Sequence, residues 1–410
     1  MELGPIFRSL VHNKARFWLI ALEVAMTLAI VANCVNWMLD MRGEFLRDTG
    51  IDEENVLIVH TEPWAPEFKD EEFVHVQRDQ DIERLKALPG VLGVAGLHQI
   101  PLSGGGSNTG RKPIGSEMDT LPAPYFIVTE DILDALGVEL LEGRTFNQAD
   151  FDERRANEEL DSEASQHYNI VVSKAFADSM YPDGDALGKQ IESTNGERVN
   201  TIVGIVEEMH NSWPEWEKRD LAMLIPGRPG DDRRMRYAVR VEPTAVSTAY
   251  TGIEELLLAI NPGRIIEVRT IAEIKNETFA AINAMVKMLT GVIFFLVLVT
   301  SLGIVGLTAS AVTQRTRQIG TRRALGATKV DIVRYFLVEN WLITGFGLVF
   351  GVAMTYGLNY LLIQFAAVPK MDPVRLVGRV VALWLTGVLA ALAPALKATA
   401  VAPEVATRTI

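Results

Sequence analysis

Between Phe17 and Leu39 the chain reads FWLIALEVAMTLAIVANCVNWML, a run of 23 residues with a single charged side chain, Glu23. A helix of this length spans roughly 35 Å, which exceeds the hydrocarbon thickness of a bilayer, about 30 Å. The run is too long for the apolar part of a cleavable signal peptide, and no small-residue cleavage site follows before Asp40. It therefore predicts a transmembrane helix that is retained in the protein.

Three further apolar stretches lie in the C-terminal third of the 410-residue chain. Leu289–Val312 is uncharged, Asn340–Pro369 contains thirty residues without a charge, and Val380–Leu396 lies between Arg379 and Lys397. The shortest stretch can be lengthened when these basic side chains reach toward the membrane surface. We therefore expect an α-helical membrane protein with four transmembrane helices.

The charge is distributed very unevenly along the chain. The formal net charge is +1 over residues 1–39, −22 over residues 40–283 and +8 over residues 284–410, for a total of −13. An acidic block between apolar blocks is typical of a water-exposed domain inserted between membrane helices. The acidic excess also argues against nucleic acid as a partner, because such binding depends largely on Lys and Arg.

These patterns predict three regions. Residues 1–39 form a tail and the first transmembrane helix, 40–283 form an external domain, and 284–410 hold the other three helices. Basic residues near helix ends mark the cytoplasmic side. The tail carries three of them, and the connection at about 313–334 carries six against one aspartate, Asp331. Both termini and this connection are therefore expected in the cytoplasm, although Lys370, Arg375 and Arg379 give a weaker opposite bias.

The external domain has the alternating signals of an α/β fold. Its ends each contain a strand–helix–strand pattern, which predicts two β-α-β units in a split α/β sandwich. The predicted elements are Asn55–His60, Gln77–Leu88 and Val91–Ile100, then Arg236–Val241, Thr244–Ile260 and Ile265–Arg269.

A second subdomain is predicted within about residues 125–225. Its expected helices are Glu130–Leu136 and Lys174–Met180, and its expected strands are Asn169–Val172 and Asn200–Val206. Glu153–Gln166 is acidic and poor in apolar residues, which predicts a solvated loop or a ragged helix.

The external domain offers little catalytic chemistry. Residues 103–112 read SGGGSNTGRK, which approaches the phosphate-binding pattern GxxxxGK[ST]. However, Arg111 takes the lysine position, and Lys112 and Pro113 follow where a hydroxyl is needed, so we expect a flexible surface loop. The six histidines have no paired ligand spacing, no nucleophile motif is present, and Cys34 is the only cysteine. The sequence predicts no catalytic residue, no metal site and no cofactor bound by this chain.

The first apolar stretch contains three polar residues, Glu23, Asn33 and Asn36. One interpretation places them along a polar pathway through the membrane, and the other gives them hydrogen bonds across a helix–helix contact. The second interpretation is favoured. In the third stretch, Gly347 and Gly351 form a GxxxG pattern that predicts close helix packing.

The basic connection, residues 314–327, reads QRTRQIGTRRALGA. A lipid-bound basic helix is one interpretation, because anionic headgroups attract arginine. Gly320 and Gly326 interrupt such a helix, and this favours short helices held against a partner protein.

The connection resembles the cytoplasmic signature of the MacB/FtsX-like ABC transporter permease family, approximately R-x-R-E-I-G-x-x-R-A-L-G-A. In the external domain, Gly137–Asp150 resembles the family's G-I-x-L-x-x-G-R-x-F…D stretch, and three further family landmarks follow in order. These are Ile170–Ser173, Leu187–Lys189 and Ile202–Val206. Two departures stand out, because Gln318 replaces the usual glutamate and Pro394–Ala398 lacks the arginine of the C-terminal motif.

The resemblance implies a MacB-type periplasmic core domain outside a bacterial inner membrane. It also implies a non-catalytic permease that transmits the work of a separate ATPase, which holds ATP and Mg²⁺, to this domain for export. A separate ATPase is expected because no nucleotide-binding domain precedes the first helix. The residues implied in ATPase coupling are Arg315, Arg317, Gln318, Ile319, Gly320, Arg322, Arg323, Ala324, Leu325, Gly326 and Ala327.

The same family implies further partners and an alternative role. A second permease, identical or related, would complete the complex, and a periplasmic adaptor would engage the external domain. In the alternative, the complex regulates external enzymes or extracts lipoproteins from the membrane instead of exporting a solute.

Overall fold

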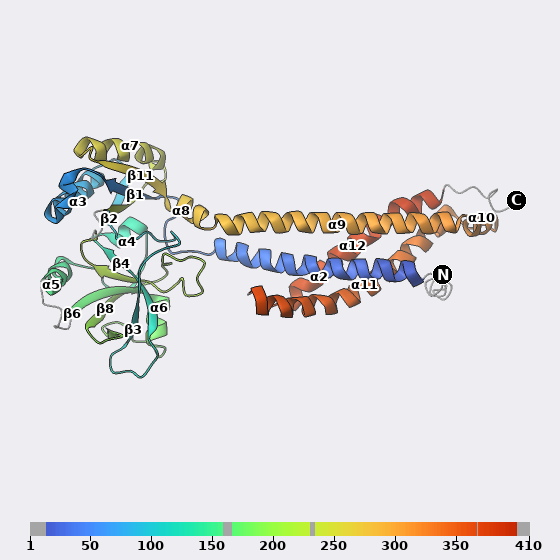
Figure 1. Cartoon of the computed structure of the whole chain (residues 1–410), viewed down its shortest axis with the longest axis horizontal. Helices are drawn as coiled ribbons and strands as arrows, with labels where there is room; N and C mark the ends of the chain where they lie inside the picture. The colour runs from blue at the N-terminus through green and yellow to red at the C-terminus, as the bar shows by residue number, and fades with distance from the viewer. Residues whose placement is uncertain (1–13, 159–165, 230–233, 367, 400–410) are drawn as a thin grey trace. The chain divides into compact units, whose positions relative to one another are not determined.

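The computed structural model describes residues 14–158, 166–229, 234–366 and 368–399. The chain separates into two compact units (Figure 1). One unit combines the residues up to Leu46 with those from Ile282 onward, and the other consists of Arg47–Ala281.

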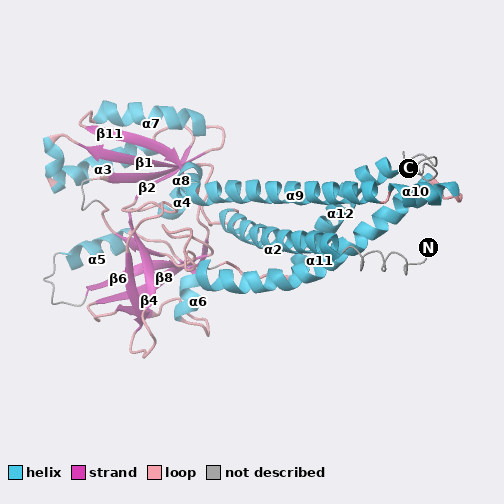
Figure 2. Cartoon of the chain, turned by 45° about the vertical axis from the view of Figure 1, so that its right-hand side comes forward, coloured by secondary structure: helices cyan, strands magenta, loops and turns pink. Residues whose placement is uncertain are grey.

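The first unit is helical. Its elements are α2 (Lys14–Phe45), α9 (Ala280–Gln314), α10 (Thr316–Ala324), α11 (Lys329–Ala366) and α12 (Pro373–Ala398). The four long helices run side by side (Figures 1 and 2), and each is long and apolar enough to cross a membrane. The prediction of four apolar membrane helices is confirmed.

All four helices are longer than their apolar stretches, and α11 shows this most clearly. The 38 residues of α11 extend over roughly 57 Å, and this helix starts at Lys329 instead of near Asn340. Its first turns carry Asp331, Arg334 and Glu339. Hydropathy detects the part of a helix that lipid can surround, whereas charged turns continue the same helix in water.

Close packing of α2 against α11 depends on the GxxxG pair. A Cβ atom added at Gly347 would lie 2.7 Å from the carbonyl oxygen of Ala21, and one at Gly351 would lie 3.0 Å from Leu28 Cδ2. The two backbones can therefore approach only because these side chains are absent, as the sequence predicts. The apolar core of the unit contains Ile20, Val24, Leu28, Ala32, Ile304, Ile343, Leu348, Met371, Leu376, Leu383 and Ala391.

The second unit contains a four-stranded antiparallel sheet in the order β11-β1-β10-β2. Its elements are β1 (Val56–Pro63), η1 (Pro66–Lys69), α3 (Glu71–Lys86), β2 (Val91–Gly96), β10 (Met235–Val241), α7 (Val246–Ile260), β11 (Arg264–Thr270) and α8 (Ile271–Thr278). Each β-α-β unit has a strand of the other unit between its own strands, which confirms the predicted split arrangement.

One face of this sheet packs against α3 and α7 through the apolar residues Leu57, Val59, Val74, Leu85, Tyr237, Val239, Ile253 and Leu257. A buried ion pair crosses this core. Arg264 Nη2 donates to Asp81 Oδ1 at 2.8 Å, and Tyr237 Oη donates to Asp81 Oδ2 at 2.7 Å. The pair joins α3 to the edge strand β11, and its hydrogen bonds compensate for the loss of hydration.

A second sheet has seven strands in the order β5-β8-β6-β9-β4-β3-β7, and β7 also pairs with β8, so six strands form a closed circuit. The strands are β3 (Asn108–Pro113), β4 (Leu121–Val128), β5 (Leu140–Gly143), β6 (Gln166–Ser173), β7 (Gln190–Ser193), β8 (Arg198–Val206) and β9 (Met223–Pro226). The associated helices are α4 (Ile132–Leu136), α5 (Gln148–Glu158) and α6 (Lys174–Met180).

The four elements predicted inside the insertion are present, but the sheet begins earlier, at Asn108. The prediction of a flexible loop was wrong for residues 108–113, which form β3. Buried Arg111 holds this strand by donating from Nε to Asn200 Oδ1 at 3.0 Å. Of the predicted acidic loop or ragged helix, residues 153–158 belong to α5, and residues 159–165 lie outside the described residues.

Candidate functional site

The basic connection between α9 and α11 folds as α10 followed by a tight turn. The backbone N–H of Gly326 donates to Arg323 O at 3.1 Å, and that of Ala327 donates to Arg322 O at 3.0 Å. Gly326 has φ +98°, a left-handed conformation. This is the Schellman arrangement that ends a helix at a glycine. Gly326 therefore ends α10, as the sequence suggested.

The next helix starts immediately after the turn. Thr328 N donates to Asp331 Oδ2 at 3.0 Å, and Asp331 N donates to Thr328 Oγ1 at 3.2 Å. These reciprocal bonds satisfy free N–H groups at the start of α11. Gly320, by contrast, lies buried inside α10 and does not interrupt it, which corrects the prediction for this residue.

The inner face of α10 is anchored by Ile319, whose exposed fraction is 4%. This side chain belongs to a cluster with residues of α9, α11 and α12, namely Val312, Ile332, Phe336, Ala395 and Ala398. One short helix thus packs against the ends of three long ones.

A buried carboxylate strengthens this anchor. Arg315 Nη1 lies 3.0 Å from Glu339 Oε1 and 3.1 Å from Oε2, while Arg16 Nη1 lies 3.8 Å from Oε1. Glu339 is 1% exposed. Two arginines from different parts of the chain thus share one carboxylate on α11.

Two further arginines contact neighbouring helices. Arg323 Nη1 donates to the carbonyl oxygen of Thr399, the residue that caps α12, at 3.0 Å. The guanidinium of Arg322 lies 4.6 Å from the ring centroid of Tyr335, a cation–π contact.

The outer face of the connection mixes basic and apolar side chains. Leu325 is 83% exposed and Val330 is 73% exposed, so two apolar side chains flank the turn. Arg317 and Gln318 are also exposed. Arginine with exposed apolar side chains is a composition that suits a protein–protein contact.

The predicted coupling residues thus divide between two surfaces. The inner surface contains two buried residues, Ile319 and Gly320. It also contains three partly buried ones, Arg315, Arg323 and Ala327. The exposed members are Arg317, Gln318, Arg322, Ala324, Leu325 and Gly326. Glu339, Tyr335 and Val330 were not predicted to take part. The only sign of these residues in the sequence was the charge of Glu339 directly before the apolar stretch that starts at Asn340.

The two asparagines of α2 contact α11 and the connection that follows it. Asn33 Nδ2 donates to Thr355 O at 3.2 Å, and Asn359 Nδ2 donates to Asn33 Oδ1 at 3.0 Å. Asn36 Nδ2 donates to Pro369 O at 3.1 Å. These bonds support the helix-contact interpretation.

Glu23 lies at the contact between α2 and α9. A Cβ atom at Gly303 would clash with Glu23 Oε1, so the absence of a side chain makes room for the carboxylate. One turn further along α2, Thr27 Oγ1 and Thr300 Oγ1 are 2.6 Å apart and share a hydrogen bond. The contact of Glu23 is again one between helices.

A possible metal-ligating group occurs in the external domain. His210 Nε2 lies 3.0 Å from Asp220 Oδ1 and 3.8 Å from Glu208 Oε1. Burial, helped by the charges of Arg219 and Lys275, lowers the pKa of His210 to about 4, so its imidazole is neutral near pH 7. The same cations disfavour a divalent ion here, and we interpret the group as a polar cluster of a neutral imidazole and two carboxylates. The sequence spacing of these three residues matches no known ligand motif, which is why the sequence analysis did not identify them.

Comparison with solved structures finds two external domains of transporters. The periplasmic region of MacB from Actinobacillus actinomycetemcomitans is 15% identical, with a TM-score of 0.35, and the match covers 57% of this chain and 96% of that one. The extracellular domain of the transporter YknZ from Gram-positive bacteria is 14% identical, with a TM-score of 0.34, and the match covers 53% of this chain and all of that one.

Sequence relatives cover more of the chain. The uncharacterized ABC transporter permease YvrN of Bacillus subtilis is 26% identical over 301 residues, 68% of this chain and 69% of that protein. The macrolide export ATP-binding/permease protein MacB of Chromobacterium violaceum is 26% identical over 287 residues, 67% of this chain. The match spans only 42% of that longer protein.

Two family models account for most of the sequence. The MacB-like periplasmic core domain matches residues 19–266, and the FtsX-like permease C-terminal region matches residues 290–403. The chain is thus a membrane protein with a periplasmic-type domain between its first helix and the others. It belongs to the MacB/FtsX-like family of ABC transporter permeases.

Proposed function

We propose that this permease converts ATP hydrolysis on a separate ATPase subunit into movement of its external domain, and that this movement drives export. ATP and Mg²⁺ are held by the ATPase, and the permease is not catalytic. The observation that carries the proposal is the anchoring of α10 to the ends of α9, α11 and α12 through Ile319.

The ATPase binds the outer face of the connection. Leu325 and Val330 supply exposed apolar contacts, and Arg317 adds a charged one. Gln318 replaces the usual glutamate of the family, so this position contributes a hydrogen bond in place of a charge.

Displacement of α10 then reaches the membrane helices by three contacts. Ile319 presses on the apolar cluster, the Arg315–Glu339 pair pulls on α11, and Arg323 pulls on the end of α12. The polar contacts found within the membrane join helices, which suits a protein that moves helices.

The complex we propose lies in the bacterial inner membrane, with both termini and α10 in the cytoplasm and residues 47–281 in the periplasm. It contains two permeases, identical or related, and a periplasmic adaptor that engages the external domain. The basic residues of the 313–334 connection support this orientation.

The test is affinity purification of the full-length permease from its native membrane, followed by identification of its subunits. We expect an ABC ATPase in the complex. The variant Leu325→Asp places a charge in the proposed contact and should reduce recovered ATPase about tenfold, the effect expected of a central interface residue. Leu92→Asp, at an exposed leucine in the external domain, is the matched control and should recover the ATPase normally.

An ATPase bound equally by both variants would exclude this contact surface, and a complex without any ATPase would exclude the proposed function. An adaptor among the subunits supports export. A wall-degrading enzyme or lipoprotein-sorting factors in its place would assign the permease to regulation or lipoprotein extraction.

A further inference from the structure

One face of the four-stranded sheet changes from apolar to charged along its strands. On the face opposite α3 and α7, Ile58 and Ala238 belong to an apolar core. Two residues further along β1, His60 pairs across the sheet with Arg236 on β10 and with Glu267 on β11. Side chains opposite each other on a sheet lie close together. The charged part of this face therefore concentrates ionisable groups from three strands.

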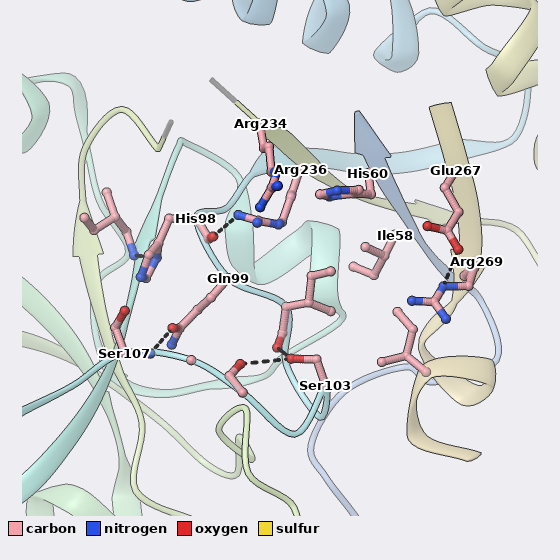
Figure 3. A pocket seen from close by; sticks show the side chains of 15 residues that line it. Ile58, His60, His98, Gln99, Ser103, Ser107, Arg234, Arg236, Glu267 and Arg269 are labelled. Atoms are coloured by element: carbon pink, nitrogen blue, oxygen red, sulfur yellow. Dashed lines mark hydrogen bonds and ion pairs between the residues drawn. The ribbon is translucent and has the colours of Figure 1, made fainter. Parts of the chain in front are cut away.

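This charged face lines a cavity of about 640 Å³ (Figure 3). Arg234, Arg236 and Arg269 come from the sheet side of the cavity. Opposite them, the segment 98–107 contributes Gln99, Ser103 and Ser107. This segment includes the glycine-rich stretch that approaches a phosphate-binding pattern in the sequence.

The cavity is basic inside an acidic domain. Among the described residues that line it, three are arginines and one is a glutamate, Glu267. Arg269 Nε lies 3.2 Å from Glu267 Oε1, and its Nη1 also pairs with Glu277. Arg234 Nη2 lies 3.5 Å from Glu62 Oε1. All five side chains are at least one-third exposed. Exposed pairs of this kind are weak, so an incoming anion can replace them.

His60 adds a neutral polar group to this wall. Burial, followed by the charge of Arg236, lowers the pKa of His60, so the imidazole is uncharged near pH 7. Its Nδ1 atom is buried and forms no hydrogen bond with any described residue.

The rest of the wall is apolar. The side chains of Ile58, Ile100, Ile127 and Ile274 line the cavity together with the polar groups. A volume near 640 Å³ falls in the range of small-molecule sites, about 300–1,000 Å³. Such a cavity fits a ligand with a charged head and a short apolar body.

We propose that this cavity binds a small anionic amphiphile, whose carboxylate or phosphate head is held by Arg234, Arg236 and Arg269 and whose apolar part contacts the isoleucines. Guanidinium groups are suited to both heads, because they donate paired hydrogen bonds to two oxygens. The proposal concerns ligand binding in the external domain and is independent of ATPase coupling.

The experiment measures binding by isothermal titration calorimetry to the full-length permease in phosphatidylcholine nanodiscs. The probes are octyl phosphate, octanoate, octylammonium and inorganic phosphate. We expect saturable binding of octyl phosphate or octanoate, and the tighter of the two identifies the head group. Octylammonium should not bind, and inorganic phosphate should bind at least tenfold more weakly than octyl phosphate.

Two variants test the site by different means. Arg236→Gln removes a charge and should weaken binding at least tenfold. Gly105→Leu keeps every charge and should weaken binding similarly by filling the cavity, because no atom lies within 4 Å of a Cβ built there. Arg240→Gln is the matched control, since Arg240 lies on the same strand but pairs with Asp52 outside the cavity lining.

The proposal is overturned if octylammonium binds as tightly as the anions, if no anion binds saturably, or if Gly105→Leu binds like the unaltered protein. Equal affinity for inorganic phosphate and octyl phosphate would overturn the proposal that the ligand has an apolar part in contact with the isoleucines. If Arg236→Gln lowers the melting temperature, the Gly105→Leu variant decides the outcome.

Discussion

Glu339 shows how a single buried charge can organise a membrane-protein junction. Its carboxylate accepts hydrogen bonds from Arg315 and lies within 4 Å of Arg16, so it joins residues from α2, the start of α10 and α11. A carboxylate with 1% exposure is tolerated because these partners compensate for lost hydration. The position of α10 therefore depends on this residue.

We predict that Glu339→Gln destabilises the permease, because Arg315 and Arg16 then share a neutral acceptor. The expected loss is about 2 kcal/mol, the size of a hydrogen bond to a charged group. Thermal unfolding of the purified protein measures it. Glu215→Gln, at an exposed glutamate of the external domain, should change little, and equal effects of the two variants would refute the role of Glu339.

His210 gives the external domain a defined dependence on pH. Its pKa is about 4 in the folded protein and 6.5 in an ordinary environment. Between these values the unfolded state binds a proton that the folded state excludes. The contribution is therefore complete above pH 6.5 and is lost as the pH falls toward 4, with a maximum of about 3 kcal/mol.

The prediction is checked by unfolding measurements on the protein and on His210→Asn at pH 7, 5.5 and 4.5. Stability of the unaltered protein should fall more steeply across this window than that of the variant. Parallel curves would show that His210 does not titrate as inferred.

At the scale of elements, the periodic pattern of apolar residues predicted the strands and helices that are stabilised by apolar burial. The strand β6, the helix α6 and the strand β8 were found from the sequence because their buried faces are made of Ile, Val and Phe. The strand β3 reads NTGRKP and was expected to be a loop. Arg111 joins it to β8 through Asn200 and also bonds to Thr109 and Gly110 within β3. A pattern of apolar residues does not indicate such contacts.

The connection between α9 and α11 was predictable only where its residues are neighbours in the sequence. Its basic residues and Gly326 are adjacent in sequence, so the segment and its end were visible. Glu339 lies 24 positions after Arg315, and nothing in the sequence indicates that the two side chains meet. Gly320 was misinterpreted, because glycine inside a helix costs only about 1 kcal/mol and packing at a buried position outweighs it.

We predict that the turn after α10 requires a residue that tolerates φ +98°. Gly326→Val should reduce the coupling of ATP hydrolysis to transport, because a β-branched residue is strained there by at least about 1 kcal/mol. Gly326→Asn should retain more coupling, since asparagine accepts left-handed conformations.

The measurement compares ATPase activity and transport in reconstituted vesicles. Gly357→Val is a control, because this glycine of α11 also has no neighbour within 4 Å of an added Cβ but lacks a positive φ. Wild-type coupling in Gly326→Val would refute the role of the turn.

At the scale of the whole molecule, the proposed mechanism requires the external domain and α10 on opposite sides of a membrane. Cys34 is the only cysteine, so Cys34→Ser gives a background without thiols. We predict that Glu197→Cys reacts with an impermeant maleimide in intact cells with a permeabilised outer membrane, whereas Gln318→Cys reacts only after lysis. Both native side chains are exposed.

Labelling of both positions before lysis would contradict the mechanism. Labelling of Gln318→Cys alone before lysis would show that the orientation in the membrane is opposite to the proposed one.

The asparagine contacts of α2 restrict how this helix can move. Asn33 bonds to Thr355 and Asn359 of α11, and Asn36 bonds to the backbone of Pro369. Lipid cannot replace these bonds, so twisting α2 about its own axis would leave several polar groups unsatisfied in hydrocarbon. The helix can shift or incline together with α11, but torsion is suppressed. In the proposed mechanism, translation and inclination of α2, and not its rotation, therefore move the external domain that follows it in the chain.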